Sequence, residues 1–467
     1  MKISKIIITF LAIFLLLIII ATFFPKDGVN VGSIHLHFPS LSEALLDKKT
    51  NYVDIDSIVD ESLTDINSQK DSTQVKIKSN NIVEIELPND NPYYLDNFFT
   101  AIQNAKTNNK KVRIIHYGDS QIEGDRITSY IRMRMQKSFG GSGQGQIPIH
   151  SLSAISNIHY TYSPNIHFYS IIDPKQHSFK HYGLMQSASV PYIRTIIDTI
   201  TNDTTILRTA NINIKFDKSI SGNLTLYCSN PTTNSRISIF SKNELIEEYS
   251  LIPSTELLSL PIHLNNATKS LHLQIKGSPE LYSLDFSFES GVYVDNVSLR
   301  GSSGYGFSRG DSDMLTDMSS KLNVKLIILQ FGVNAIPQDN TILPGYNFYK
   351  SKFSKQITYL KKTNPNAAII VIGVSDRSIN KNGNYITNPN IPKLLAAQKS
   401  AAEENGVAFW NLFQAMGGEN SMPSWVQRKH PLANTDFIHF NTYGAKYVAE
   451  MFYQALETAY KDFQNRQ

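Results

Sequence analysis

Apolar and polar residues follow different patterns in successive parts of the chain. Residues 6–24, IIITFLAIFLLLIIIATFF, form an uncharged run with Lys2 and Lys5 ahead of it. A helix rises about 1.5 Å per residue, so a run of this length is enough to cross a bilayer. Bulky residues end the run, whereas a signal-peptide cleavage site needs small ones. Residues 1–25 are therefore expected to be an uncleaved membrane anchor, with secretion after signal cleavage as the alternative.

The residues around this run predict its orientation in the membrane. Lysines before a membrane helix, with no matching cluster just after it, favour a cytoplasmic amino terminus. We expect an inner-membrane anchor that holds everything beyond residue 25 outside the cytoplasm, in the periplasm. Residues 26–92 are rich in Asp, Ser, Asn and Lys and poor in aromatic residues, which is typical of a solvated linker or stalk.

Strands and helices alternate in two separate stretches of the chain. In residues 93–150, apolar residues at helical spacing lead into an apolar strand at 112–117. In residues 300–467, the pattern predicts strands at 324–331, 367–373 and 407–412 and helices at 346–362, 392–404 and 442–463. Such alternation favours a mostly parallel sheet that helices cover on both faces.

The stretch between them, residues 151–299, has a different pattern. Short segments such as INIKF, NLTLYCS and GVYVDNVSL alternate apolar and polar residues, and Gly, Pro, Asn or Ser separates them. This spacing is typical of an antiparallel β-sandwich. The sequence thus predicts an α/β unit, 93–150 plus 300–467, interrupted by an all-β insert.

Composition and charge exclude several kinds of partner. The 467-residue chain has a net charge of only +4 and no Lys/Arg cluster with interleaved aromatic residues, so no nucleic-acid partner is expected. No His/Cys/Asp cluster has the spacing of metal ligands, and we expect neither a metal nor a cofactor. Cys228 is the one cysteine, which excludes an intramolecular disulfide. The segment GGSGQG at 140–145 lacks the lysine of a phosphate-binding loop, and we interpret it as a flexible connection.

A serine stands at the turn between the first strand and the helix after it. Gly118 permits a tight turn, and Ser120 follows it at the carboxyl edge of the sheet, where open α/β folds place their ligands. A serine nucleophile needs a base within hydrogen-bond reach and a group that orients the base. Asp436 and His439, three residues apart before the last helix, can supply both. The pattern predicts Ser120 as nucleophile, His439 as base and Asp436 as the orienting carboxylate.

Other polar residues near this turn have separate interpretations. The backbone N–H groups of Ser120 and Gly301, with the side-chain amide of Asn334, can converge on a developing oxyanion. His116 lies within the strand, where it is expected to pack or hydrogen-bond, and His430 has no Asp at the matching offset. We expect the three arginines of the following helix to form its solvated face: Arg126, Arg132 and Arg134.

Ser120, Gly301, Asn334 and His439 follow one another along the chain, and the motifs around them resemble the four blocks of the SGNH, or GDSL-type, hydrolases. Gly118-Asp119-Ser120 matches the nucleophile block, Gly301 the second, Gly332-Val333-Asn334 the third and Asp436-Phe437-Ile438-His439 the fourth. The chain departs from the pattern at Ala335, where many members have Asp. The resemblance implies a flavodoxin-like three-layer sheet, catalytic Ser120, Asp436 and His439, an oxyanion hole from Ser120, Gly301 and Asn334, and no cofactor.

The β insert between the first two blocks is similar to the layout of cell-envelope peptidoglycan O-acetylesterases, whose insert is carbohydrate-binding-like. The resemblance implies a serine esterase that removes O-acetyl groups from an acetylated glycan such as peptidoglycan, held at the membrane by its anchor. Two alternatives stay open at this point. One is an O-acetyltransferase with the same triad and a membrane acetyl-transfer partner, and the other is a non-catalytic envelope glycan-binding protein.

Overall fold

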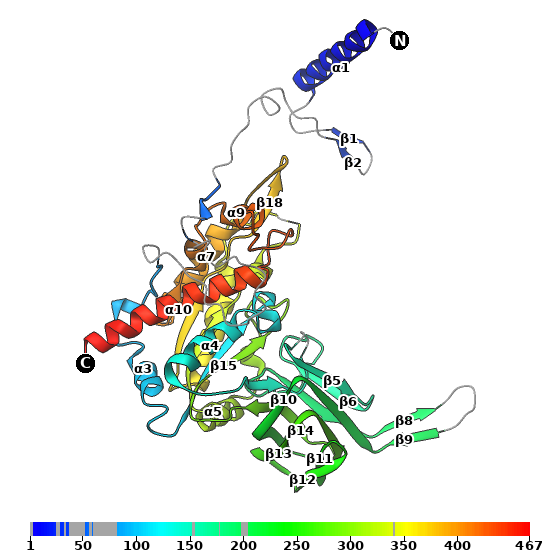
Figure 1. Cartoon of the computed structure of the whole chain (residues 1–467), viewed down its shortest axis with the longest axis vertical. Coiled ribbons are helices and arrows are strands. Elements are labelled where there is room, and N and C mark those ends of the chain that lie inside the picture. Colours follow the sequence, from blue (N-terminus) through cyan, green and yellow to red (C-terminus); the bar gives the residue numbers. More distant parts are fainter. Residues whose placement is uncertain are drawn as a thin grey trace. The chain divides into compact units, whose positions relative to one another are not determined.

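The computed structural model describes residues 3–24, 29–31, 34–36, 52–55, 58, 82–151, 155–176, 178–197, 204–339 and 341–467. The chain divides into two units, Met1–Tyr52 and Val53–Gln467 (Figure 1). The first contains helix α1 (Ile3–Phe23) and the antiparallel pair β1 (Val29–Val31) and β2 (Ile34–Leu36). Across the described residues, no helix combines the length and the apolar character of a membrane span. The anchor at 1–25 stays a prediction, and most of the expected linker at 26–92 lies outside the described residues.

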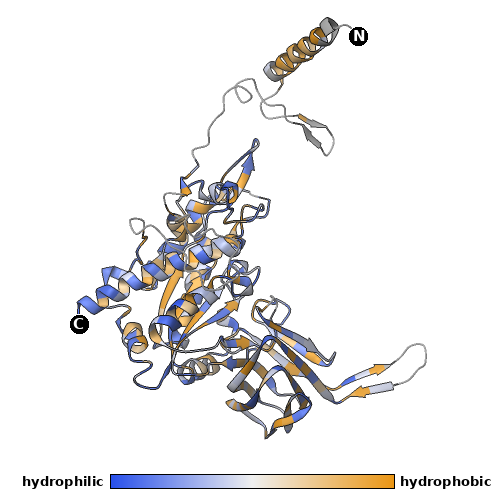
Figure 2. Ribbon diagram, viewed as in Figure 1, coloured by the Kyte–Doolittle hydropathy of each residue, from blue (hydrophilic) through white to orange (hydrophobic). Residues whose placement is uncertain are grey.

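A five-stranded parallel sheet organises the second unit. Its strands lie in the order β15-β3-β16-β17-β20. Because β3 comes first in the chain and β15 second, this is the 2-1-3-4-5 order of flavodoxin-like folds. The strands are strongly hydrophobic (Figure 2), as expected when both faces are buried. Their bounds are β3 (Lys111–Gly118), β15 (Gly291–Ser298), β16 (Val324–Gln330), β17 (Ala368–Ile372) and β20 (Ala408–Trp410).

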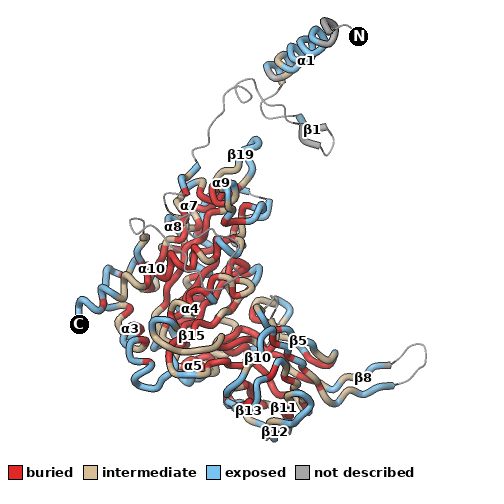
Figure 3. The backbone as a smooth tube through the Cα atoms, viewed as in Figure 1, coloured by how far each residue is buried: buried red, intermediate tan, exposed pale blue. Residues whose placement is uncertain are grey.

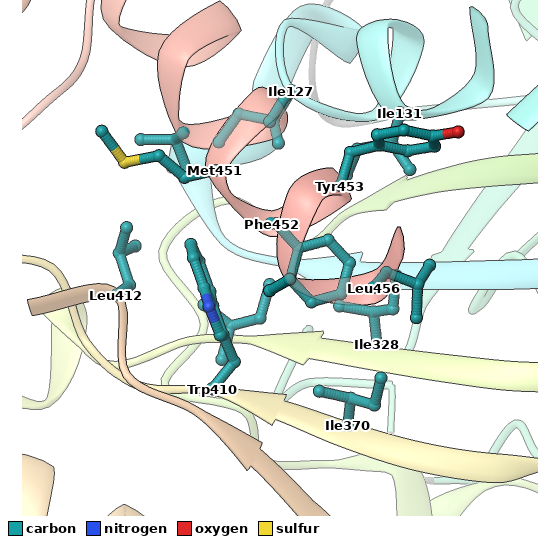
Figure 4. Close-up of a cluster of buried hydrophobic side chains, with 14 of the residues drawn as sticks. Ile127, Ile131, Ile328, Ile370, Trp410, Leu412, Met451, Phe452, Tyr453 and Leu456 are labelled. Atoms are coloured by element: carbon teal, nitrogen blue, oxygen red, sulfur yellow. The ribbon is translucent and has the colours of Figure 1, made fainter. Parts of the chain in front are cut away.

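Helices cover both faces of this sheet, so the α/β unit has three layers. On one face, Trp410 of β20 and Ile328 of β16 pack with Phe452 and Leu456 of the last helix (Figure 4). On the other face, Ile327 and Leu329 of β16 and Val371 of β17 pack against the second set of helices. The first face carries α3 (Asp96–Gln103), α4 (Thr128–Phe139) and α10 (Thr442–Asn465), and the second carries α5 (Ser312–Lys321), α6 (Asn347–Thr363) and α7 (Asn390–Glu404).

Short elements lie in the loops around the sheet, most of them beyond its carboxyl edge. They are the 3-10 helices η4 (Pro88–Asp90), η5 (Ser120–Asp125), η6 (Phe307–Arg309) and η7 (Val333–Ala335), the hairpin β18 (Ser378–Lys381) and β19 (Asn384–Thr387), and the helices α8 (Leu412–Ala415) and α9 (Ser421–Gln427). Two of them, η5 and η7, directly follow β3 and β16 and so begin at the sheet edge.

The insert is an antiparallel sheet with a core of its own. Bulges in the long strands β10 and β13 interrupt their register, which lets a strand bend. Inward-facing residues such as Ile212, Leu226 and Leu273 form a buried cluster, and the buried interior is visible in Figure 3. The strands are β4 (Gly145–Pro148), β5 (Ile158–Tyr162), β6 (Ile166–Ser170), β7 (Ser187–Pro191), β10 (Thr209–Asn230), β11 (Ser235–Ser241), β12 (Glu244–Leu251), β13 (Ser254–Lys276) and β14 (Glu280–Phe286), beside the pair β8 (Arg194–Ile197) and β9 (Thr204–Leu207).

Two strands lie on the other side of the boundaries that the sequence suggested at 151 and 299. Strand β15, which we expected within the insert, pairs in parallel with β3, residue Val294 beside Ile114. Strand β4, which precedes residue 151, pairs with β14 of the insert. The insert therefore begins and ends several residues earlier than predicted.

The segment GGSGQG, expected to be a flexible connection, is closely packed. A Cβ at Gly143 would lie 1.8 Å from the carbonyl oxygen of Phe286, and one at Gly145 would lie 2.3 Å from Asp295 Oδ1. Both glycines also have φ near or above +80°. Glycine stands there because the backbone approaches its neighbours too closely for a side chain.

A buried charge network joins the insert to the parallel sheet. Arg113 of β3 donates to Asp295 of β15 at 2.8 Å and to Asp285 of β14 at 2.7 Å. All three residues are buried, and burial of a charge is tolerated only when it is paired and hydrogen-bonded. The insert and the parallel sheet thus share one hydrogen-bonded junction.

Candidate active site

Three turns at the carboxyl edge of the sheet are hydrogen-bonded to one another. They follow β3, β15 and β16, and Ser120 stands in the first. After β15, the N–H of Leu299 donates to the carbonyl oxygen of Gly118 at 2.7 Å, and the Ser298 hydroxyl donates to that of Asp119 at 3.2 Å. After β16, the Asn334 amide donates to the carbonyl oxygen of Ser302 at 3.1 Å. The edge therefore holds the nucleophile turn from two sides.

The structure brings Ser120, His439 and Asp436 together in one chain of hydrogen bonds. Ser120 Oγ lies 2.9 Å from His439 Nε2, and His439 Nδ1 lies 2.7 Å from Asp436 Oδ2. Ser120 is 8% exposed, whereas the Asp436 and His439 side chains are 43% and 31% exposed. The arrangement has the geometry of a nucleophile, a base and an orienting carboxylate.

A closed loop holds the base and the carboxylate. The N–H of Asn434 donates to the carbonyl oxygen of His439 at 2.8 Å, and the N–H of Phe437 donates back to that of Asn434 at 3.0 Å. Phe437 has a φ of +56°, which lets the chain reverse within a few residues. Asn441 then caps α10 by accepting from the N–H groups of Tyr443 and Gly444 at 3.0 Å.

The hairpin of β18 and β19 packs against this loop. The Tyr385 ring stacks on the Phe437 ring with centroids 3.5 Å apart, and the N–H of Ser378 donates to the Phe437 carbonyl oxygen at 3.0 Å. The Arg377 guanidinium donates to the carbonyl oxygen of Val333 at 3.0 Å, so it links the hairpin to the turn after β16. The pKa of Arg377 is lowered, chiefly by burial.

The Asp436 carboxyl is held in its ionised form. Partial burial by itself raises its pKa, but hydrogen bonds from the backbone and ring of His439 and from the N–H of Ile438 outweigh burial, and the net pKa lies below the usual value. Asp436 Oδ1 accepts from those two N–H groups at 3.0 and 2.9 Å, which leaves Oδ2 for the ring. An ionised Asp436 fixes the proton of His439 on Nδ1 and leaves Nε2 as acceptor for Ser120.

Gln121, a residue that the sequence analysis did not single out, connects the serine turn to the histidine loop. Its Nε2 donates to the carbonyl oxygen of Ile438 at 2.8 Å, and its Oε1 accepts from the N–H of Phe440 at 3.3 Å. These are the two residues on either side of His439. One buried amide therefore spans the loop that carries the base, directly beside the nucleophile.

The buried carboxyl of Asp119 supports the other side of the turn. Burial raises the pKa of Asp119 to about 7, although N–H groups of Gln121 and Gly332 and the Asn334 side chain hydrogen-bond to it and lower its pKa in part. Gln121 N–H donates to Asp119 Oδ1 at 3.0 Å. The carboxyl thus binds the turns after β3 and β16 to each other.

The remaining predicted oxyanion residues lie at the same edge. Gly301 is exposed with a φ of +80°, in the turn that Leu299 hydrogen-bonds to Gly118. Asn334 is also exposed, and its amide donates to Ser302 and to Asp119. The structure places both residues in turns that are hydrogen-bonded to the turn of Ser120, and their roles in an oxyanion hole stay a prediction.

Other side chains near the turn are structural. His116 is buried between Thr128 and Gln330, with its ring nitrogens 2.9 and 3.0 Å from their side-chain oxygens, and burial lowers its pKa to about 3. The prediction that the three arginines form a solvated face is wrong for Arg132 and Arg134. Arg132 is buried in an ion pair with Asp125, and Arg134 is largely buried against Glu450. Neither partner is evident from the sequence pattern, because Glu450 lies 316 residues from Arg134 and Asp125 lies in the turn before the helix.

Within the described residues, no group of three or more His, Cys, Asp and Glu side chains is arranged to hold a metal ion.

No family model and no curated protein matches the chain. A solved peptidoglycan O-acetylesterase is similar over 79% of this chain and 96% of its own length, with a TM-score of 0.60 and 17% identity. This chain shares the fold of that esterase. The flavodoxin-like parallel sheet that the family resemblance implies is confirmed.

A family two carbohydrate esterase from Cellvibrio japonicus is a more distant structural match. It is similar over 65% of this chain and 99% of its own length, with a TM-score of 0.24 and 11% identity.

Proposed function

We propose that the protein is a serine esterase that removes O-acetyl groups from a carbohydrate of the cell envelope, such as peptidoglycan. The observation that carries the proposal is the hydrogen-bonded chain from Ser120 through His439 to Asp436, with distances of 2.9 and 2.7 Å. Two findings support it: the charge state favoured for Asp436 and the fold shared with a peptidoglycan O-acetylesterase.

The first half of the reaction forms an acyl-enzyme. Ser120 Oγ attacks the acetyl carbonyl carbon while its proton moves to His439 Nε2. Negative charge develops on the carbonyl oxygen, toward which we assign the backbone N–H groups of Ser120 and Gly301 and the amide of Asn334. The bond to the sugar oxygen then breaks, and that oxygen takes the proton from Nε2. The products are a free sugar hydroxyl and acetylated Ser120.

The second half uses the same residues on a water molecule. Nε2 of His439 accepts a proton from water as its oxygen attacks the acetyl carbonyl carbon. The bond to Ser120 Oγ breaks, Oγ regains the proton, and acetate leaves. Asp436 keeps its charge throughout and stabilises the positively charged ring in both halves.

The test is to incubate the purified full-length protein with an aryl acetate and with an O-acetylated glycan, with and without an added sugar acceptor. The proposal expects acetate release from both esters, with little dependence on the acceptor. Absence of acetate from both substrates contradicts it. Transfer of acetyl to the acceptor in place of acetate release contradicts the hydrolase and favours the O-acetyltransferase.

The location of the protein outside the cytoplasm is part of the same proposal. It rests on the uncharged run of residues 6–24 and on Lys2 and Lys5 before it. Fractionation of cells that express the full chain tests it, because an anchored periplasmic protein sediments with membranes and is cut by protease added to spheroplasts. Recovery in the cytoplasmic fraction contradicts this location.

A further inference from the structure

A small polar cavity lies at the junction between the insert and the α/β unit, beside the nucleophile turn. Its volume is about 40 Å³. The walls come from η5 and α4, from β4 and the residues after it, from β6 and the residues around β7, and from the end of β15. Ser298 lines the cavity and donates to the carbonyl oxygen of Asp119, the residue before Ser120. A molecule bound here therefore lies next to the turn that carries the nucleophile.

Three of the lining side chains have buried polar atoms without a hydrogen-bond partner. Both amide atoms of Gln146 are unpaired, as are Gln186 Oε1 and His150 Nδ1. Gln146 and Gln186 are each only 1% exposed. A buried polar atom without a partner is costly, and a cluster of them around one cavity indicates that a polar group belongs there.

The charges of the cavity wall are already neutralised. Asp125 and Arg132 are the charged residues among those that line it in the described structure, and they form a bidentate ion pair at 2.7 and 3.0 Å. Burial also lowers the pKa of His150, which keeps its ring neutral. The unpaired atoms therefore select for a neutral group and not for an anion or a metal ion.

The rest of the wall defines the shape of that group. Gln146 offers one amide donor and one amide acceptor side by side, and these match the C=O and N–H of another amide. Ile147, Met185 and Val297 add apolar surface that suits a methyl group. Since one water needs about 10–15 Å³ of such space, the cavity holds a group of about three or four heavy atoms. An acetamido group has this size, one donor, one acceptor and a methyl.

We propose that this cavity binds the acetamido group of an N-acetylated sugar while an O-acetyl group of the same glycan reaches Ser120. The inference rests on the proposed esterase function and narrows its substrate to glycans that contain N-acetylated sugars. In this site, the side-chain amide of Gln146 hydrogen-bonds to the C=O and N–H of the acetamido group.

The test compares wild type with Gln146→Leu, which keeps side-chain bulk and removes both polar atoms. The readout is the ratio of kcat/KM for O-acetylated chitooligosaccharides to kcat/KM for O-acetylated cello-oligosaccharides, which lack the acetamido group. Wild type should prefer the first class, and Gln146→Leu should lower the ratio at least tenfold. The Tm of Gln146→Leu should not fall, because the substitution removes a buried amide that makes no hydrogen bond in the free protein. An unchanged ratio overturns the proposal. A Tm lowered by several degrees also overturns it, because the Gln146 amide then has a structural partner, such as a buried water, in the free protein.

The matched control is Ser189→Ala, which also removes a buried polar group without a partner, here a hydroxyl that does not line the cavity. Its Tm should also hold, while its substrate ratio should equal that of wild type. Calorimetric titration of the Ser120→Ala protein with chitobiose and with cellobiose tests the site without catalysis. If chitobiose binds with measurable heat and adding Gln146→Leu to the Ser120→Ala protein abolishes that heat, the acetamido site is supported even if the enzyme cleaves no ester. Equal binding of both sugars overturns it.

Discussion

Two groups of polar side chains, the triad at the sheet edge and the lining of the junction cavity, differ in whether their atoms are paired. At the sheet edge, Ser120, His439 and Asp436 each hydrogen-bond to the next. In the junction cavity, Gln146 and its neighbours have buried atoms with no partner. In the proposed reaction, the geometry of the paired group is fixed before substrate arrives, whereas the unpaired group gains its partners when the acetamido group binds. The proposal therefore assigns chemistry to the first group and substrate recognition to the second.

The largest effect is expected from loss of the base in the paired group. His439→Ala should lower kcat for an aryl acetate on the order of 10⁶-fold, because nucleophile and base act as a unit. The matched control is His430→Ala, whose histidine lies outside the hydrogen-bonded chain, and it should keep wild-type turnover. Steady-state kinetics on folded protein, checked by circular dichroism, decide the matter. Substantial turnover by His439→Ala contradicts the assigned base.

Asp119 also belongs to the hydrogen-bonded group, but burial makes its ionised form unfavourable. Its pKa is about 7 in the folded protein and 3.8 as the ordinary value. A raised folded pKa means that its stabilising contribution is complete below pH 4 and is lost as the pH rises through 7. At 1.36 kcal/mol per pKa unit, wild type should lose roughly 4 kcal/mol relative to Asp119→Asn over this window. Urea unfolding of both proteins from pH 4 to 8 measures the difference, and parallel curves contradict it.

Asn334 tests whether the paired network rearranges during the reaction. Its amide now donates to Ser302 and Asp119, and a role in the oxyanion hole requires a donation to the substrate oxygen. Asn334→Ala should lower kcat by ~10²- to 10³-fold, or about 3 to 4 kcal/mol, with little change in KM. If KM rises while kcat stays within about twofold, Asn334 is a binding or structural residue.

The smallest effect is expected for Gln121, which acts through the loop that holds His439. Gln121→Met removes the hydrogen bonds to Ile438 and Phe440 and should lower kcat by about tenfold, or about 1.4 kcal/mol, with KM unchanged. Gln136→Met is the control, since that amide hydrogen-bonds to Gly143 away from the site. Equal kcat for both variants shows that Gln121 does not position the base.

Local spacing in the sequence is enough to single out the three residues that the structure joins by hydrogen bonds. Asp436 and His439 lie three residues apart on one loop, and Ser120 follows a glycine at a strand end, so each is visible without knowledge of the fold. The mostly parallel sheet also follows from the alternation of strands and helices, and its flavodoxin-like character follows from the family resemblance, but the place of β15 in it does not. Residues that act across the fold had no such signal: Gln121 is one polar residue in a turn, and its two partners lie 317 and 319 residues away.

Buried charges explain the main error in the predicted layout. The segment GVYVDNVSL alternates apolar and polar residues, Asp295 among the polar ones, and this alternation favours a strand of the insert. In the structure Asp295 is fully buried, and Arg113 of the neighbouring strand neutralises it. A hydropathy pattern counts an ionised residue as exposed unless its partner is known, and here the partner lies 182 residues away.

In the proposed reaction Ser120 forms an acyl-enzyme, and the decisive experiment is to trap that intermediate. The full-length protein is mixed with excess aryl acetate, quenched in acid within the first turnovers, digested with protease and analysed by mass spectrometry, beside Ser120→Ala treated in the same way. The account predicts one added acetyl group on the wild-type peptide that contains Ser120 and none on the same peptide of the variant. An acetylated residue elsewhere with Ser120 unmodified, or equal acetate release by Ser120→Ala, would contradict it.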